Sequence, residues 1–482
     1  MVRADLVTSE PRSRIHEAYD RLCEAEEQFG LLRHTVDGWS AWPLLRFEVS
    51  ILLSGVIFDH RHVVSRGERL RHALADLPSL IRPRHARHLV KTYVSGLIEP
   101  SGDRYRDIWF DDVLLIAGST FKIETENNPR FANRRALIPP DISSAVLDLG
   151  GAIVRRVRTS PRIRDVATEL SRVLSGPLGL AHIDADWVAH RLERFSARKG
   201  IYSTLLRRVR PRYVLVADAG DHDLMAAAKE QDIIALEFQH GISDWSNASY
   251  SWPASARAFR RTMPIPDRLL LYGEHWKHEL DGSGFWGDDL RVVGSPRLDR
   301  YRREVQTRDQ RRCQMVFTTQ GLDIDRVTAF FREFPERAAP VFPLNLVIKL
   351  HPVYDADKRP YLDALAAYAD RVSVLASDEG ASTFELLQTA HLHVSIASAS
   401  HYDALGLGVP TVILPFQTHE VVLSLHRAGH AQLAATPQAL VEIARSWRDL
   451  RVPPGVSEYY FAPDGCANIL RELDLTTTGA PR

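Results

Sequence analysis

Two short motifs in the second half of the chain place donor side chains directly after apolar, strand-like runs. Lys349 and His351 end the stretch Leu344–Pro352, in which apolar residues surround a single lysine and the final proline cannot continue a strand. Ser295 and Arg297 follow an earlier run of the same kind. Ammonium, imidazole, guanidinium and hydroxyl groups are donors to phosphate oxygens. Because ligands bind at the carboxyl ends of the strands in open α/β sheets, the two motifs suggest a ligand site, and a histidine in an ordinary loop is the alternative interpretation for His351.

A third motif, Ser395–Leu414, combines a strand end, two serines and a helix start. Ser398 and Ser400 precede a helix that carries Asp403 and ends at a glycine. Free backbone N–H groups and serine hydroxyls at a helix N-terminus can bind an anion. The motif predicts a second set of phosphate donors, and an ordinary helix cap is the alternative.

The first half of the chain also collects polar residues at strand ends. Gln239 and His240 follow the apolar run that starts at Ile233. Asp218 and Asp221 lie in a turn after another apolar run, and Asp223 begins the helix that follows. Because the carboxyl ends of parallel strands meet at one edge, these side chains are candidates for a shared site, and helix capping is the alternative for the three carboxylates.

Alternating strands and helices predict an α/β fold with two Rossmann-like domains facing a cleft. We expect a mainly helical N-terminal extension at residues 1–104, a first domain at 105–264 and a second, nucleotide-donor domain at 265–482. The first strand and turn of this pattern are assigned to Asp107–Gly118.

The composition excludes several classes of protein. The 482 residues carry a formal net charge of zero, so no overall positive field attracts nucleic acid. Three widely spaced cysteines fit neither a zinc site nor a disulfide framework. The N-terminus lacks a signal-peptide core, and Leu44–Phe58 is too short and too charged to span a bilayer. We therefore expect a cytoplasmic protein.

Two features could mark a surface contact. Trp39, Trp42, Leu45 and Val49 have helical spacing, which favours a core helix over one that touches lipid. Basic residues gather in the segment 61–91 and again at 155–164, and such runs are either solvated faces or contacts to an anionic membrane. Peripheral association with the inner face of the plasma membrane is thus an open alternative.

The order of the motifs resembles a known family. Gln-His-Gly, Gly-Ser-Pro-Arg, Lys-Leu-His-Pro and the serine motif, spread over residues 210–420, are similar to those of bacterial capsule and teichoic-acid transferases of the GT-B fold. This group includes capsular polysaccharide glycosyltransferases, polysialyltransferase-like enzymes and CDP-glycerol glycerophosphotransferases.

The resemblance implies a metal-independent glycosyltransferase, without a cofactor, that moves a sugar from a nucleotide donor, often a cytidine nucleotide, to a surface-polysaccharide or lipid-linked acceptor. His351 and the hydroxyls of Ser398 and Ser400 would hold the donor phosphate and nucleotide. His240 would be the general base, with Gln239 orienting it or touching the substrate. The other residues that we assign by their motifs are Ser295, Arg297 and Lys349 at the nucleotide, Asp218 at the substrate, and Asp221 and Asp223 as rival bases.

The chain departs from the family pattern in two places. Asp378-Glu379-Gly380 matches an acidic motif of related sialyltransferases but follows His351, so we interpret it as a surface loop. Ile242-Ser243 replaces the Thr-Pro expected of a glycerophosphotransferase, which favours a sugar donor. A nucleotide-sugar epimerase of the UDP-N-acetylglucosamine 2-epimerase type and a non-catalytic scaffold are the competing hypotheses.

Overall fold

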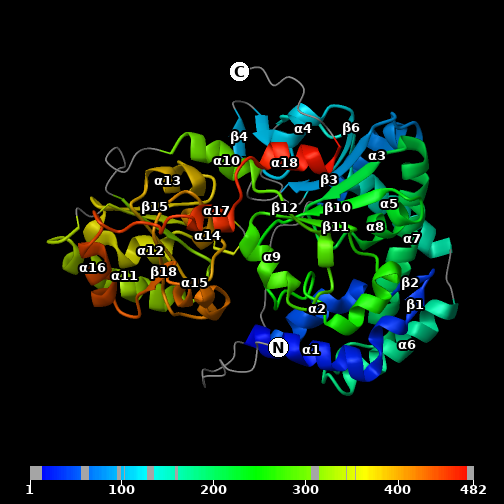
Figure 1. Ribbon diagram of the computed structural model, residues 1–482, viewed down its shortest axis with the longest axis horizontal. Coiled ribbons are helices and arrows are strands. Elements are labelled where there is room, and N and C mark those ends of the chain that lie inside the picture. Colours follow the sequence, from blue (N-terminus) through cyan, green and yellow to red (C-terminus); the bar gives the residue numbers. More distant parts are fainter. Residues whose placement is uncertain are drawn as a thin grey trace.

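The computed structural model describes residues 14–55, 65–94, 99–101, 104–126, 135–157, 161–305, 314–342, 345–352, 354–355 and 357–474. Two α/β lobes lie side by side, the first on the right of Figure 1 and the second on the left. The predicted α/β fold with two Rossmann-like units is confirmed.

The first lobe contains a parallel sheet of seven strands among the described residues. Its spatial order is β12 (Leu290–Val292), β11 (Arg268–Leu271), β10 (Ile234–Phe238), β9 (Tyr213–Val216), β3 (His88–Val94), β6 (Thr120–Glu126) and β8 (Ile142–Ser143). One face is covered by α3 (Arg66–Ile81), α5 (Ser144–Val157), α7 (Ala185–Val209) and α8 (His222–Lys229), and the other by α4 (Asp111–Ala117) and α18 (Gly465–Glu472). Successive residues of β3 enter opposite cores, Leu89 on the α7 side and Val90 on the α4 side, because side chains alternate along a strand.

The second lobe contains a parallel sheet of six strands within the described ranges. Its order is β15 (Val372–Leu375), β14 (Leu346–Lys349), β13 (Met315–Thr318), β16 (Leu392–Ser395), β17 (Thr411–Ile413) and β18 (Ala431–Leu433). One face is covered by α11 (Ile324–Ala338), α12 (Arg359–Ala364) and α16 (Pro437–Arg445). The other face is covered by α10 (Pro296–Arg303), α13 (Thr383–Thr389), α14 (Ser400–Gly406) and α15 (Leu423–Arg427). All residues of β14 are buried, as its apolar run predicts.

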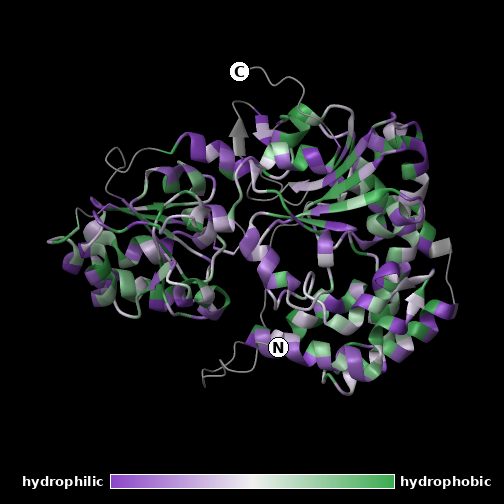
Figure 2. Ribbon diagram, viewed as in Figure 1, coloured by the Kyte–Doolittle hydropathy of each residue, from purple (hydrophilic) through white to green (hydrophobic). Residues whose placement is uncertain are grey.

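A helical layer, formed by α1 (Arg14–Phe29), α2 (Pro43–Ser54) and α6 (Pro161–Ser175), packs below the first sheet (Figure 1). Trp42, Leu45 and Val49 are fully buried there, so the prediction of a core helix is confirmed, while Trp39 lies in the short β2 (Trp39–Ser40), which pairs with β1 (Thr35–Val36). A small sheet joins β4 (Glu99–Ser101), β5 (Arg104–Arg106) and β7 (Arg135–Ala136). In Figure 2 the strands of the first sheet are largely hydrophobic, and the surrounding helices alternate hydrophobic and hydrophilic positions.

Aromatic side chains join the two lobes. The rings of Trp276 in α9 (Glu274–Asp281) and Tyr402 in α14 lie 4.7 Å apart, and Tyr460 in α17 (Val456–Tyr460) packs on both. From α17 the chain returns to the first lobe, where α18 packs beside α4 and α10 (Figure 1). The return passes so close to Gly294, whose φ is 90°, that a Cβ there would lie 2.2 Å from the Ala462 carbonyl oxygen.

The predicted domain limits require correction. Strand β3 lies at the centre of the first sheet, although residues 1–104 were expected to be a helical extension, and β11 and β12 belong to this sheet although they follow residue 264. The sequence did not reveal β3 as a buried strand because it contains the charged residue Lys91. In the structure Lys91 is buried in an ion pair with Asp221. Residues 111–117, expected within a strand and turn, form α4, since a short apolar run fits either structure.

Candidate functional site

The first lobe has a switch point between β3 and β9. From β3 the chain adds β6 and β8 on one side and then returns to add β9, β10, β11 and β12 on the other. In doubly wound sheets, ligands bind outside the carboxyl ends of the strands at such a point. The turn with Asp218 and Asp221 follows β9 directly, so the structure places these carboxylates at the switch point.

Asp218 is the charged centre of this edge. Its carboxylate accepts a 2.9 Å hydrogen bond from the Gly220 N–H. Burial tends to raise the pKa of Asp218, but the charge of Lys91, the interaction with His240 and this hydrogen bond together hold the pKa below its ordinary value. Asp218 therefore stays ionised at neutral pH and interacts with His240.

His240 is half-buried and ends a hydrogen-bonded chain whose other members, Tyr250 and Glu237, are buried. Its Nδ1 lies 3.1 Å from the Tyr250 hydroxyl, which donates its only proton to the carboxyl group of Glu237 on β10. The His240 Nδ1 must then donate its own N–H to Tyr250, which leaves Nε2 as a proton acceptor. Burial lowers the pKa of His240, so the ring is neutral at pH 7.

Gln239 holds the end of β10 in place. Its amide nitrogen donates to the Gly241 carbonyl at 2.8 Å, and its amide oxygen accepts from the Tyr272 N–H at 2.8 Å. The side chain is buried and ties the turn that carries His240 to the neighbouring strand β11. These contacts hold the turn in which His240 lies.

The N-terminal helices hold the loop that carries Tyr250. Arg46 of α2 is 1% exposed, forms an ion pair with Glu26 of α1 and donates to the Ser251 carbonyl at 2.6 Å. Its guanidinium also stacks on the Trp252 ring, 3.9 Å from the centroid. The helical layer thus fixes the backbone on which Tyr250 sits.

A polar cavity of about 590 Å³ opens beside Asp218. Ion pairs line it, with Lys91 on Asp221 and Arg198 on Asp223. Burial, followed by the charge of Arg198, lowers the pKa of Lys91 to about 8. The structure therefore brings all three predicted carboxylates to one cavity, but Asp221 and Asp223 are each held by a buried cation.

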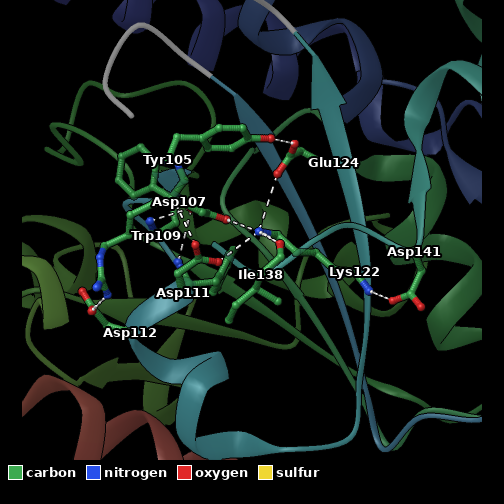
Figure 3. A network of polar contacts seen from close by, with 11 residues as sticks. Tyr105, Asp107, Trp109, Asp111, Asp112, Lys122, Glu124, Ile138 and Asp141 are labelled. Atoms are coloured by element: carbon green, nitrogen blue, oxygen red, sulfur yellow. Dashed lines mark hydrogen bonds and ion pairs between the residues drawn. The ribbon is translucent and has the colours of Figure 1, made fainter. Parts of the chain in front are cut away.

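A second network holds the neighbouring loop at Trp109 (Figure 3). The Lys122 ammonium lies among three carboxylates, 3.0 Å from Asp111, 3.5 Å from Glu124 and 3.7 Å from Asp107. Asp107 accepts from the Trp109 N–H at 2.8 Å. The network fixes the backbone at Trp109, whose ring lies 6.2 Å from the His240 ring, edge to face.

Aromatic rings lie at this edge and beside His351 of the second lobe. The Tyr93 ring lies 5.9 Å from that of Trp109. Burial raises the pKa of Tyr93. Acidic groups add to this shift, first Asp218 and last the Tyr354 hydroxyl of the second lobe. Tyr354 stacks on His351, with centroids 4.6 Å apart. His240, Trp109 and Tyr93 are thus consecutive ring neighbours in the first lobe, and His351 and Tyr354 form a separate ring pair in the second.

The tautomer of His351 is fixed by the backbone. The Tyr354 N–H donates to its Nδ1 at 3.1 Å, so the ring proton is on Nε2. Burial lowers the pKa of His351 to about 4, so the ring is neutral at pH 7 and carries its one proton on Nε2. Gly321 lets this loop approach, because a Cβ there would lie 2.2 Å from the Tyr354 carbonyl oxygen.

The second sheet has its own switch point, between β13 and β16. The serine motif follows β16, where the Ser400 hydroxyl contacts Thr318 at 2.7 Å and donates to the Ser398 hydroxyl at 2.8 Å. His393 lies behind them, 2.9 Å from Thr318. Ser400 is buried in this network, whereas Ser398 is partly exposed.

The remaining predicted donors have structural contacts. The Lys349 ammonium donates to the carbonyls of Ala376 and Glu379, at 2.9 and 2.7 Å. The Ser295 hydroxyl caps α10 by accepting from the Leu298 N–H at 3.3 Å. Glu379 of the acidic motif is exposed and pairs with Lys358, so the prediction of a surface loop is confirmed.

Arg297 follows Ser295 and reaches the region between the lobes. It stacks on Phe384, 3.8 Å from the centroid, and its charge acts on Asp403 and Tyr272. Burial raises the pKa of Asp403 to about 6, while Arg297 opposes the shift.

The sequence interpretation missed several residues of this site, namely Tyr93, Trp109, Glu237, Tyr250, Gln320 and Tyr354. One signal was available, because Glu237 is the only charged residue in the apolar run of β10. Gln320 follows β13 at the second switch point and accepts from the Ala397 N–H at 2.9 Å, and finding it required the strand order.

The part of the chain that the structure describes contains neither a candidate metal site nor a candidate membrane-spanning helix. Its His, Cys, Asp and Glu side chains form no group of three or more that could hold a metal ion. None of its helices combines the length and the apolar character needed to cross a membrane.

No protein-family model and no curated protein matches the chain. Among solved structures, it is similar to UDP-GlcNAc 2-epimerase from Neisseria meningitidis bound to UDP-GlcNAc, at 15% identity and a TM-score of 0.48, over 80% of this chain and 99% of that one. The Methanocaldococcus jannaschii UDP-GlcNAc 2-epimerase gives 11% and 0.48, over 80% and 99%. Acinetobacter baumannii MurG gives 11% and 0.44, also over 80% and 99%. These similarities are distant, and the fold assignment rests on the strand orders given above.

Proposed function

We propose that the protein is a nucleotide-sugar-dependent enzyme that binds its substrate between the two switch points. The supporting observation is the pair of fixed tautomers, since His240 offers a proton acceptor in the first lobe and His351 a proton donor in the second. Phosphate oxygens accept hydrogen bonds, and a sugar hydroxyl needs a base to lose its proton. The two rings therefore suit the two ends of a nucleotide sugar.

The second lobe would hold the nucleotide and its phosphates. In this proposal His351 donates Nε2–H to a phosphate oxygen, and the Ser398 hydroxyl and the Arg297 guanidinium add further donors. Three other predicted donors would support the site without touching the ligand, because their polar atoms already bind protein groups: Ser295, Ser400 and Lys349. The preference for a cytidine base and the absence of a cofactor stay predictions from the sequence.

The first lobe would carry out the proton transfer. Nε2 of His240 would take the proton of a sugar hydroxyl, and the ionised Asp218 nearby would stabilise the imidazolium that forms. Tyr250 and Glu237 would keep the ring in the required tautomer. Asp221 and Asp223 would shape the cavity through their ion pairs with Lys91 and Arg198.

We infer sugar transfer as the reaction because the cavity of about 590 Å³ beside Asp218 has room for a second substrate. Its walls carry both signs of charge, which suits a hydroxyl-rich acceptor such as a surface polysaccharide. Epimerisation of the nucleotide sugar, the reaction in the names of two similar structures, is the second candidate. The closeness of Asp218 and His240 favours it, since epimerisation at carbon needs an acid and a base.

Nucleotide binding tests the donor site. Isothermal titration of CMP, CDP, UDP and GDP into wild type, His351→Ala and the control His430→Ala should show the preferred base. We expect His351→Ala to weaken binding of that nucleotide at least 10-fold, about the loss of one hydrogen bond to a charged group. His430 is hydrogen-bonded to the hydroxyl of Tyr460 in α17. The His430→Ala variant should therefore bind the nucleotide as wild type does. Equal affinity in all three proteins would remove His351 from the site.

The reaction itself is distinguished by product analysis. With the preferred nucleotide sugar and no acceptor, proton NMR in deuterium oxide would reveal exchange at the sugar carbon if the protein is an epimerase. Nucleotide release that depends on added saccharide would identify transfer. His240→Gln should abolish whichever activity is found, and an unchanged rate in that variant would exclude His240 as the base.

A further inference from the structure

Helix α3 carries an exposed apolar stripe. Leu70, Leu74, Leu77 and Ile81 are 50, 58, 43 and 53% exposed. Their spacing of four, three and four residues places them on one side of the helix. The flank next to the stripe is packed, because Ala73 is buried in the first-lobe core. A stripe of large apolar side chains that faces water marks a contact surface.

The stripe continues onto α5 and into the protein. Leu149 and Ile153 on α5 are 36 and 56% exposed, and α3 packs against α5 (Figure 1). Ile81 and Ile153 line a second cavity, of about 810 Å³, whose lining is mostly apolar but also includes Asp37 and the charged α7 residues Glu193, Lys199 and Arg208. The cavity therefore opens at the edge of the apolar surface.

Positive charge surrounds this surface. Arg69, Arg71 and Arg82 are exposed on or next to α3. Of the two acidic residues of the helix, Asp76 accepts from the Ser143 N–H and points to the core, and Glu68 forms the N-terminal capping box. The solvent-facing side of α3 thus combines apolar side chains with arginines.

We propose that this α3–α5 face docks on an anionic lipid bilayer. The leucines and isoleucines would enter the acyl region, the arginines would bind lipid phosphates, and the second cavity would accept a hydrocarbon chain. A second copy of the chain would bring the same arginines against each other, at a cost in repulsion. The six apolar side chains are also fewer than the roughly 20–30 residues that each partner contributes to a stable protein interface.

Vesicle co-sedimentation tests the proposal. The full chain is mixed with vesicles of phosphatidylcholine alone, or of phosphatidylcholine and phosphatidylglycerol in equal parts, at low and high salt. We expect binding only to the anionic vesicles, weakened by salt. Replacing Arg69, Arg71 and Arg82 by glutamine should weaken binding roughly 100-fold, since each basic residue near an anionic surface contributes about 1 kcal/mol.

The apolar stripe has a matched control on another helix. Leu74→Gln with Leu77→Gln should lower binding at least 10-fold, because two side chains no longer enter the bilayer. Leu115→Gln with Ile116→Gln on α4, where both residues are 59% exposed, should leave binding unchanged. All four residues face solvent, so circular dichroism should show folded variants. Equal binding to both vesicle types, or an unaffected Leu74/Leu77 variant, would overturn the proposal. So would light scattering that shows a dimer of wild type lost in this variant, because the face would then bind a second copy.

Discussion

Glu237 gives the sharpest test of the proposed site, because its carboxyl group is buried beside Tyr250 without a cation. Only 2% of the residue is exposed, and burial raises its pKa from an ordinary 4.5 to about 8, although the hydrogen bond from Tyr250 opposes the shift. At neutral pH the folded protein thus keeps a proton on Glu237 that the unfolded chain has lost, and this proton belongs on Oε2 because Oε1 accepts from Tyr250. Replacing Glu237 by glutamine removes the titration and keeps an oxygen for Tyr250.

The magnitude follows from linkage. Because the folded pKa is raised, Glu237 contributes its full stability below pH 4.5, and this contribution is lost as the pH rises towards 8. Each pKa unit corresponds to about 1.4 kcal/mol, so the difference between 4.5 and about 8 amounts to about 5 kcal/mol. The free energy of unfolding of Glu237→Gln should therefore rise relative to that of wild type by about 1.4 kcal/mol per pH unit between pH 4.5 and about 8. Below pH 4.5 the difference between the two proteins should not change with pH.

The assay is guanidinium unfolding followed by tryptophan fluorescence, at several pH values from 4 to 9, for wild type and Glu237→Gln. Trp286 donates to the Tyr250 carbonyl and reports on this part of the first lobe. Glu333→Gln is the control, because Glu333 is an exposed partner of Arg337. The difference in the free energy of unfolding between this variant and wild type should be nearly the same at every pH. A difference between wild type and Glu237→Gln that does not change with pH would refute the inferred buried, protonated carboxyl group.

Three further changes test the same structure. Tyr250→Phe should lower kcat 10- to 100-fold with little change in KM, and alter the pH–rate profile, because His240 loses the partner of its Nδ1; an unchanged profile would contradict the tautomer argument. Arg46→Ala should destabilise the protein by about 3–5 kcal/mol in denaturant unfolding, because it leaves the Glu26 carboxylate buried without a cation, and a loss under 1 kcal/mol would be inconsistent with that ion pair. Gly294→Ala should cost at least about 2 kcal/mol, since it combines a left-handed φ with contact to the returning C-terminal segment, and wild-type stability would disprove the close approach.

The sequence by itself determined which segments are buried strands and which residues stand at their ends. The apolar runs of β9, β10, β14 and β16 are recognisable because buried parallel strands need little else than apolar side chains. A polar residue directly after such a run lies at the carboxyl edge, which is why Asp218, His240, His351 and Ser398 were found.

Only the tertiary structure decided which of these side chains lie near one another and which polar atoms already bind groups of the protein. Strand order comes from long-range pairing, so the switch points beside β3 and β13, and the assignment of β11 and β12 to the first sheet, left no local signal. Lys349 and Ser295 look like ligands in the sequence, but nearby carbonyl and N–H groups bind them, because buried polar groups require partners. The opposite tautomers of His240 and His351 depend on Tyr250 and on a backbone N–H, which act through geometry that residue types do not encode.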